Sequence, residues 1–274
     1  MRCSIMGIDT YYEVIGEGKP ILMLHGYHMD HRLMLGCMEP VFQNKKGWQR
    51  IYLDLPGMGQ TQGSSIIKNA DDILNFLLNF IDFITPNKNI LIAGQSYGGY
   101  LARGVVYKRS HSVKGLFLLC PVIIPQKNKR VLPSHSIFIQ DTALLKELEE
   151  QEKQEVVKAL VILNNRNYMR YKGEVKAGKD IAQKSFLKNI KNQGYGFTFD
   201  VDHLISPFEN PTTILTGRQD DVVGYEDAMR ITHNFSKGTY VAMDGAGHML
   251  HIEKEIFFNV MVEDWCAKVS QFLD

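Results

Sequence analysis

Residues 89–99 have the sequence NILIAGQSYGG, which decides the fold class of this chain. The stretch begins as an apolar run typical of a buried strand, and a helical pattern follows it over residues 100–107. Ser96 therefore lies at a strand-to-helix turn. Gly94 and Gly98 have no Cβ, which lets neighbouring backbone pass close to such a turn. A serine in this setting is a nucleophile elbow, with its hydroxyl pushed out of a sharp, strained turn.

Short apolar runs alternate with helical patterns on both sides of this turn. Strands are expected at residues 21–24, 50–54, 89–93, 115–120, 212–217 and 239–243. Helices are expected at residues 70–84, with Asn69 as the cap, and at 100–107, 225–235 and 252–272. Residues 8–15 alternate loosely and end at a turn pattern in residues 16–20, which predicts an opening hairpin. This alternation predicts an α/β fold with a mostly parallel sheet covered by helices on both faces.

Residues 121–206, called the cap segment below, differ in character from the rest. They contain no convincing buried strand, are rich in lysine and glutamate, and predict one helix over residues 142–163. We therefore expect an α/β core of residues 1–120 and 207–274, with the cap segment inserted over the carboxyl ends of the strands. The basic run at residues 127–130 is interpreted as a solvated loop.

Composition limits the classes of protein that this chain can belong to. Its 274 residues, 45% of them hydrophobic, suffice for one large domain with a buried core. A net charge of +1 indicates no nucleic-acid partner. We find no signal-peptide pattern, no apolar run approaching the roughly 18 residues that span a bilayer, and no disulfide framework among the four cysteines. We expect a cytoplasmic protein with no membrane partner, and the sequence leaves the oligomeric state open.

A serine nucleophile needs a base, and the base needs an orienting carboxylate. Asp220 follows the predicted strand 212–217, and His248 follows the predicted strand 239–243. The carboxyl ends of parallel strands meet at one edge of a sheet, so Ser96, Asp220 and His248 are expected to come together there. Their order along the chain, Ser then Asp then His, is the order that accompanies this type of elbow.

Other residues compete for these roles. Asp221 is an alternative acid, although the spacing from Gly217 favours Asp220, and Asp202 and Asp244 are more remote alternatives. His25 is expected to have a structural role. A superficially metal-like group consists of His28, Asp30 and His31. Because no further ligand follows at a telling spacing and no phosphate-binding loop is present, we expect neither a metal nor an organic cofactor.

Five short motifs are distributed along nearly the whole chain outside the cap segment, and their order is that of a known protein family. They are LHGY at residues 24–27, DLPGMG at 54–59, GQSYGG at 94–99, GRQD at 217–220 and GAGH at 245–248. With these motifs the chain resembles a serine-nucleophile, esterase-like member of the α/β-hydrolase fold superfamily. The resemblance implies an eight-stranded, mostly parallel sheet flanked by helices, with a helical cap inserted after the sixth strand.

The developing oxyanion of acyl transfer needs preorganised donors. The backbone N–H of Tyr97, the residue after the nucleophile, is one candidate, and the resemblance implies the backbone N–H of Tyr27 as the second. These features predict a serine hydrolase of a small ester or related acyl substrate. The alternatives are an acyltransferase or carbon–carbon bond hydrolase on the same triad, or a small-molecule receptor on a hydrolase scaffold. Serine at the elbow argues against epoxide and carbon–halogen cleavage, for which relatives use aspartate.

Overall fold

The computed structural model describes residues 1–86 and 88–273, and an eight-stranded sheet forms its centre. The strand order is β1-β2-β4-β3-β5-β6-β9-β10. Their bounds are β1 Arg2–Ile5, β2 Ile8–Ile15, β3 Lys19–Leu24, β4 Trp48–Leu53, β5 Ile90–Gln95, β6 Val113–Leu119, β9 Thr212–Gly217 and β10 Gly238–Met243. Strand β2 is antiparallel to both β1 and β4, and the other neighbouring pairs are parallel. The predicted mostly parallel, eight-stranded sheet is confirmed.

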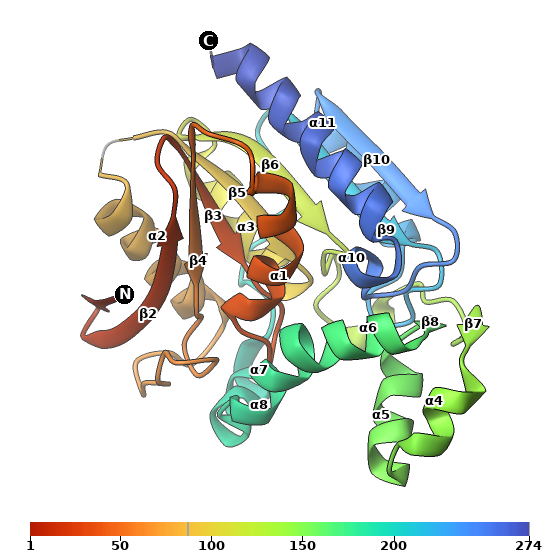
Figure 1. Ribbon diagram of the computed structural model, residues 1–274. Coiled ribbons are helices and arrows are strands. Elements are labelled where there is room, and N and C mark those ends of the chain that lie inside the picture. Colours follow the sequence, from red (N-terminus) through yellow and green to blue (C-terminus); the bar gives the residue numbers. More distant parts are fainter. Residues whose placement is uncertain (87, 274) are drawn as a thin grey trace.

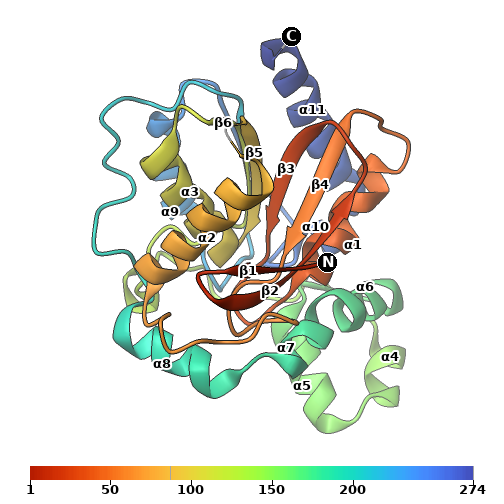
Figure 2. The same ribbon diagram turned by 90° about the vertical axis from the view of Figure 1, so that its left-hand side faces the viewer.

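Helices cover both faces of this sheet (Figures 1 and 2). Helices α1 (His31–Phe42) and α11 (Glu255–Leu273) pack on one face, while α2 (Ala70–Ile84) and α3 (Tyr97–Arg109) pack on the other. Every residue of β5 and β9 is consequently buried. Helix α2 begins as predicted, because the Asn69 side chain accepts a hydrogen bond from the Asp72 N–H at 3.0 Å.

The opening hairpin is formed differently from the prediction. Strand β2 turns back onto β1, through Met6 and Gly7 at φ 52° and 78°, and not onto β3. Strand β4 lies between β2 and β3. The turn pattern at residues 16–20 does end β2, but it leads to a strand that is not its neighbour.

The cap segment lies across the carboxyl ends of the strands (Figure 1). Its elements are η1 Lys127–Lys129, β7 Ile139–Gln140, α4 Thr142–Glu147, α5 Glu150–Ala159, β8 Ile162–Leu163, α6 Asn165–Arg170, the π-helix η2 Tyr171–Lys176, α7 Ala177–Ile181 and α8 Lys184–Gly194. The single helix predicted for residues 142–163 is wrong. Leu148 and Glu149 have extended backbone, with ψ at 143° and 151°, and Leu148 packs against the hydrophobic core. Strand β8 pairs with β7 in a small separate sheet.

The C-terminal part contains two further differences. The helix expected over residues 225–235 is a short α9 (Glu226–Arg230) followed by a 3-10 turn, η3 (Thr232–Asn234). The last predicted helix is divided into α10 (Leu250–Glu253) and α11, since Lys254 leaves helical geometry at φ −129°. All four cysteines are free. Within the described residues, no helix has the length and apolar character needed to cross a membrane.

Candidate active site

Ser96 occupies the turn between β5 and α3, with φ 54° and ψ −116°. A positive φ is strained for a residue that carries a Cβ, and such strain is found at functional sites. Glycines make the turn possible. A Cβ on Gly98 would lie 2.2 Å from the Leu24 carbonyl oxygen, and a Cβ on Gly94 would lie 2.5 Å from the Gly98 carbonyl carbon. The close backbone approach expected at this elbow is therefore present.

The structure brings Ser96, Asp220 and His248 together. The Nε2 atom of His248 lies 3.0 Å from the Ser96 Oγ atom, and its Nδ1 atom lies 2.8 Å from Asp220 Oδ2. All three residues are buried. A carboxylate only accepts hydrogen bonds, so the proton of a neutral imidazole is on Nδ1 and donates to Asp220. The Nε2 lone pair is then free to accept the Ser96 hydroxyl proton.

Asp220 and Asp221 have different partners. Asp220 Oδ1 accepts hydrogen bonds from the N–H groups of Val222 and Val223, both at 2.9 Å, which orients the carboxylate toward the imidazole. Asp221 Oδ2 instead lies 2.9 Å from the Nδ1 atom of His135. The structure thus places Asp220, and not Asp221, against His248.

The remaining candidates from the sequence lie in other contacts. Asp202 pairs with Arg103, and Asp244 accepts from Gln219. Asp30 caps α1 and pairs with Arg32, while His31 lies against Asp54. Within residues 1–86 and 88–273, the ligand atoms that do converge, within 4.8 Å of one another, belong to Cys120, Asp220 and His248. Two members of that group are already hydrogen bonded to each other.

His25 has the expected structural role, since its hydrogen bonds hold the loop that passes Ser96. Its Nε2 atom accepts from the Leu55 N–H at 3.1 Å, so its Nδ1–H donates to the Gly26 carbonyl at 2.8 Å. Burial lowers the pKa of His25, which favours this neutral form. The loop lies close to the elbow, because a Cβ on Gly26 would be 3.2 Å from the Ser96 Cβ atom.

Tyr27 and Tyr97, the two predicted oxyanion donors, lie side by side. Their ring centroids are 5.0 Å apart. Across the described chain, neither backbone N–H donates a hydrogen bond to another protein group. Tyr97 is the first residue of α3, where backbone N–H groups have no intrahelical acceptor. Both N–H groups are therefore unoccupied beside Ser96.

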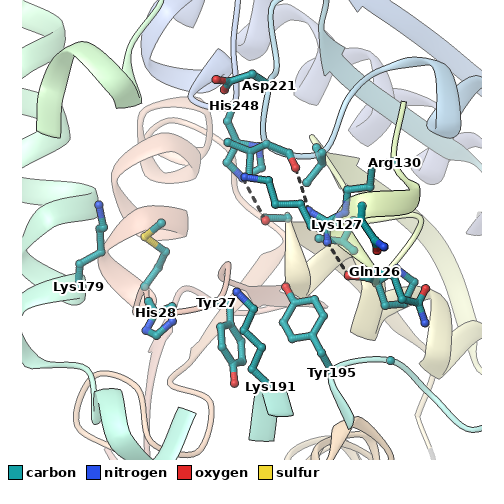
Figure 3. A pocket seen from close by; sticks show the side chains of 18 of the residues that line it. Tyr27, His28, Gln126, Lys127, Arg130, Lys179, Lys191, Tyr195, Asp221 and His248 are labelled. Atoms are coloured by element: carbon teal, nitrogen blue, oxygen red, sulfur yellow. Dashed lines mark hydrogen bonds between the residues drawn. The ribbon is translucent and has the colours of Figure 1, made fainter. Parts of the chain in front are cut away.

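A cavity of about 960 Å³ lies over Ser96 and His248, between the core and the cap segment. This volume is in the range of small-molecule sites. Figure 3 shows basic side chains on several sides of it, among them Lys127, Arg130 and Lys191. Residues 127–129 are exposed, as the interpretation of a solvated loop requires, but Lys127 and the half-buried Arg130 also line the cavity, which the sequence did not indicate.

Three further residues beside the triad were missed from the sequence. The Nε2 atom of Gln95 lies 3.3 Å from His248 Nε2. Cys120 is buried at φ 41°, with its Sγ atom near Asp220. Glu253 accepts from the N–H of Gly247, the residue before the histidine, at 2.6 Å. Gln95 could have been found from its place inside the elbow motif, whereas the contacts of Cys120 and Glu253 depend on the tertiary structure.

Known proteins share this arrangement of the chain. Residues 19–255 match the family model described as alpha/beta hydrolase fold. A solved alpha/beta superfamily hydrolase from Oenococcus oeni PSU-1 is 29% identical, with a TM-score of 0.89 and coverage of 98% of this chain and 99% of that one.

Two curated relatives are more distant in sequence. The (E)-2-((N-methylformamido)methylene)succinate hydrolase of Acinetobacter baylyi is 24% identical, over 93% of each chain. The 2-hydroxy-6-oxo-2,4-heptadienoate hydrolase of Pseudomonas putida is 21% identical, over 95% of this chain and 94% of the relative.

Proposed function

The chain belongs to the α/β-hydrolase fold family and is a hydrolase, and from this premise we propose that it cleaves a small ester or related acyl substrate through an acyl-enzyme intermediate. One observation carries the proposal: the continuous contact from Asp220 through His248 to Ser96, at 2.8 and 3.0 Å. That geometry suits transfer of the serine proton to the imidazole. The N–H groups of Tyr27 and Tyr97, which donate to no protein group in the described chain, support the proposal as candidate donors to the developing oxyanion.

In the first half of the reaction, Ser96 Oγ forms a bond to the substrate carbonyl carbon while His248 Nε2 takes the hydroxyl proton. The carbonyl electron pair moves to the oxygen, which the two backbone donors stabilise, each worth roughly 3 kcal/mol in comparable sites. When the carbonyl re-forms, the bond to the leaving group breaks, and the leaving group takes the proton from His248. Asp220 stabilises the transient imidazolium.

In the second half, water replaces the leaving group. His248 Nε2 takes a proton from the water, whose oxygen bonds to the acyl carbon, and the ester bond to Ser96 breaks as the proton returns to Oγ. The products are a carboxylic acid and the free enzyme. The cavity of about 960 Å³ above Ser96 and His248 is large enough to admit this water.

Covalent labelling tests the nucleophile. A fluorophosphonate probe should modify the wild-type protein on the peptide that contains Ser96, because only an activated serine attacks it. Ser96→Ala should abolish labelling and turnover of p-nitrophenyl esters while the protein remains folded. Ser110→Ala, at the exposed far end of α3, is the matched control and should keep both. Labelling of a different serine, or an active Ser96→Ala variant, would contradict the proposal.

A second candidate is hydrolysis of a carbon–carbon bond beside a ketone. It is favoured by the relative named 2-hydroxy-6-oxo-2,4-heptadienoate hydrolase, because an oxo acid offers a ketone carbonyl to the same nucleophile. Assaying one enzyme preparation with p-nitrophenyl esters and with a 6-oxo dienoate separates the two. Faster turnover of the dienoate, lost in Ser96→Ala, would select the second candidate.

A further inference from the structure

The cavity over Ser96 has an unusual balance of charge. Its lining contains the basic side chains Lys127, Arg130, Lys158, Lys179 and Lys191, and the acidic side chains Glu155 and Asp221. The whole chain has 31 basic and 30 acidic residues, a net charge of +1. The excess of positive charge therefore belongs to this cavity and does not reflect a basic protein in general.

Both acidic side chains of the lining already have partners. Glu155 Oε1 lies 2.9 Å from the Lys179 ammonium group, so this pair is neutral. Asp221 lies 2.9 Å from the His135 ring. A histidine ring is not a fixed positive charge, so Asp221 offsets one of the other cations of the cavity, whereas Glu155 offsets none of them.

Within the described part of the chain, the other four cations of the lining form no ion pair, so the cavity keeps an excess of positive charge beyond what Asp221 offsets. Among the residues that the structure describes, no carboxylate lies within 4.0 Å of Lys127, Arg130, Lys158 or Lys191. Lys127, Lys158 and Lys191 are exposed and Arg130 is half-buried, so water solvates these charges. Because they face one cavity, their summed field attracts an anionic ligand to it.

Arg130 is held rigidly in this group. Its guanidinium donates to the carbonyl oxygens of Ile124, Pro125 and Val222 at 2.7, 3.0 and 2.8 Å. These neutral acceptors fix its position and leave its charge in place. A preorganised cation of this kind binds an anion with little loss of side-chain entropy.

Lys191 approaches the cavity from the opposite side. Figure 3 shows its side chain beside Tyr27 and Tyr195, directed toward the interior of the cavity. Burial, followed by the positive charges of Lys191 and other nearby lysines, lowers the pKa of His28. His28 is consequently neutral at pH 7, and it adds to the binding surface without a charge of its own.

We propose that this cavity selects substrates that carry a carboxylate on the part of the molecule remote from the bond that is cleaved. The inference rests on the proposed function and adds the substrate class. The four cations come from the cap segment, whereas Ser96 and His248 belong to the core, and all of them line the same cavity. A substrate with its reactive carbonyl at Ser96 can therefore direct the rest of its acyl chain, with a carboxylate on it, toward these cations. A cleft lined by one sign of charge also concentrates oppositely charged ligands.

The test compares two esters that differ only in that charge: mono-p-nitrophenyl adipate and its methyl ester. We expect the charged ester to have a kcat/KM about tenfold higher, or more, after correction for uncatalysed hydrolysis. Raising NaCl from about 0.05 to 0.5 M should reduce the preference, because salt screens the cations. Adipate should also inhibit competitively at concentrations where neutral adipamide does not.

Variants on one helix locate the effect. Lys191→Gln should lower the ratio of the two kcat/KM values by about three- to fivefold, the contribution expected of one accessible cation. Lys188→Gln removes an exposed lysine of the same helix α8 that lies outside the cavity, and it should leave the ratio unchanged. The combined Lys127→Gln, Lys158→Gln, Lys191→Gln variant should lower the ratio further than Lys191→Gln alone, and Arg130 should account for the preference that remains.

The outcomes separate this inference from the proposed function. If both esters are cleaved with equal kcat/KM in the wild type, or if Lys188→Gln changes the ratio as much as Lys191→Gln, the carboxylate preference is refuted while the serine mechanism stands. If neither ester is cleaved and the fluorophosphonate does not label Ser96, the proposed function fails.

Discussion

Asp220 and Asp221 are adjacent in the sequence, yet the loop after β9 directs one to the imidazole of His248 and the other to His135. We predict that Asp220→Asn lowers kcat by several orders of magnitude, as with the loss of about 10⁴-fold seen in a serine protease. An amide can donate its own hydrogens toward Nδ1, which favours the imidazole tautomer that cannot accept the Ser96 proton. Steady-state hydrolysis of a p-nitrophenyl ester measures the effect.

Asp221→Asn is the matched control for this residue. It removes the same charge one position along the chain but leaves the Asp220–His248 contact intact, so kcat should change little. Removing a negative charge from the cavity should, if anything, favour an anionic substrate. A larger loss of kcat in Asp221→Asn than in Asp220→Asn would show that the acid has been assigned to the wrong residue.

At the scale of elements, Glu253 joins the cap segment to the loop that carries His248. Its Oε1 atom accepts from the Val161 and Ile162 N–H groups at 2.5 and 3.3 Å, and its Oε2 atom accepts from Gly247 at 2.6 Å. Burial raises the pKa of this carboxyl group, and the backbone donors oppose that rise. The position of His248 therefore depends on a residue that also fixes the start of β8.

Replacing this carboxylate by an amide tests the connection. Glu253→Gln keeps the size of the side chain but turns one acceptor oxygen into an NH₂ group that faces a buried N–H. We expect the free energy of unfolding to fall by about 1–3 kcal/mol, the usual loss when a buried donor has no acceptor. We also expect a lower kcat with a smaller change in KM. Urea unfolding and ester kinetics measure these effects.

Glu263→Gln, on α11, serves as the control. Its side chain is 52% exposed and pairs with Lys45 at 3.5 Å, so neither stability nor kcat should change appreciably. Should Glu253→Gln match the wild type in both measurements, the contact would not be needed to position the base.

Some elements could be predicted from the sequence because their determinants are local. The turn at Ser96 needs only an apolar strand, two glycines and a helix, all within residues 89–107. The division between α4 and α5 could not be foreseen, because Leu148 and Glu149 are good helix formers, and only packing against the core favours their extended backbone. The pairing of β2 with β4 likewise depends on contacts distant in the chain.

The same distinction between local determinants and tertiary contacts applies to the functional site. The spacing of Ser96, Asp220 and His248 relative to predicted strands was sufficient to group them at one edge of the sheet. The cations of the cavity were not grouped, because they come from separate elements of the cap segment whose lysines are typical of solvated faces. Only the tertiary structure directs Lys127, Lys158 and Lys191 toward one space.

In the whole molecule, the core and the cap segment contribute different properties to one cavity. The core supplies the residues proposed to carry the reaction, and the cap segment supplies every lysine and arginine of the lining. Substitutions in the cap segment should therefore change which substrate is bound while the Ser96–His248–Asp220 contact remains. If the cap segment controls binding in this way, it must open and close for substrate while the sheet keeps its structure.

Hydrogen exchange provides a test of that requirement. Helix α5 has one buried side chain, Val156, whereas most side chains of α3 are buried against the sheet. Local opening of α5 exposes little apolar surface, so it should cost less free energy than opening of α3. We predict that amides of residues 150–159 exchange faster than those of residues 97–109 in mass-spectrometric measurements at neutral pH. Because both segments are helices, the comparison is not affected by differences between helical and sheet amides. Covalent modification of Ser96 by a phosphonate with an acidic chain should slow exchange in α5 but not in α3. Equal and slow exchange in both helices, unaffected by the ligand, would mean that the cap segment is a fixed layer and that substrate enters by another route.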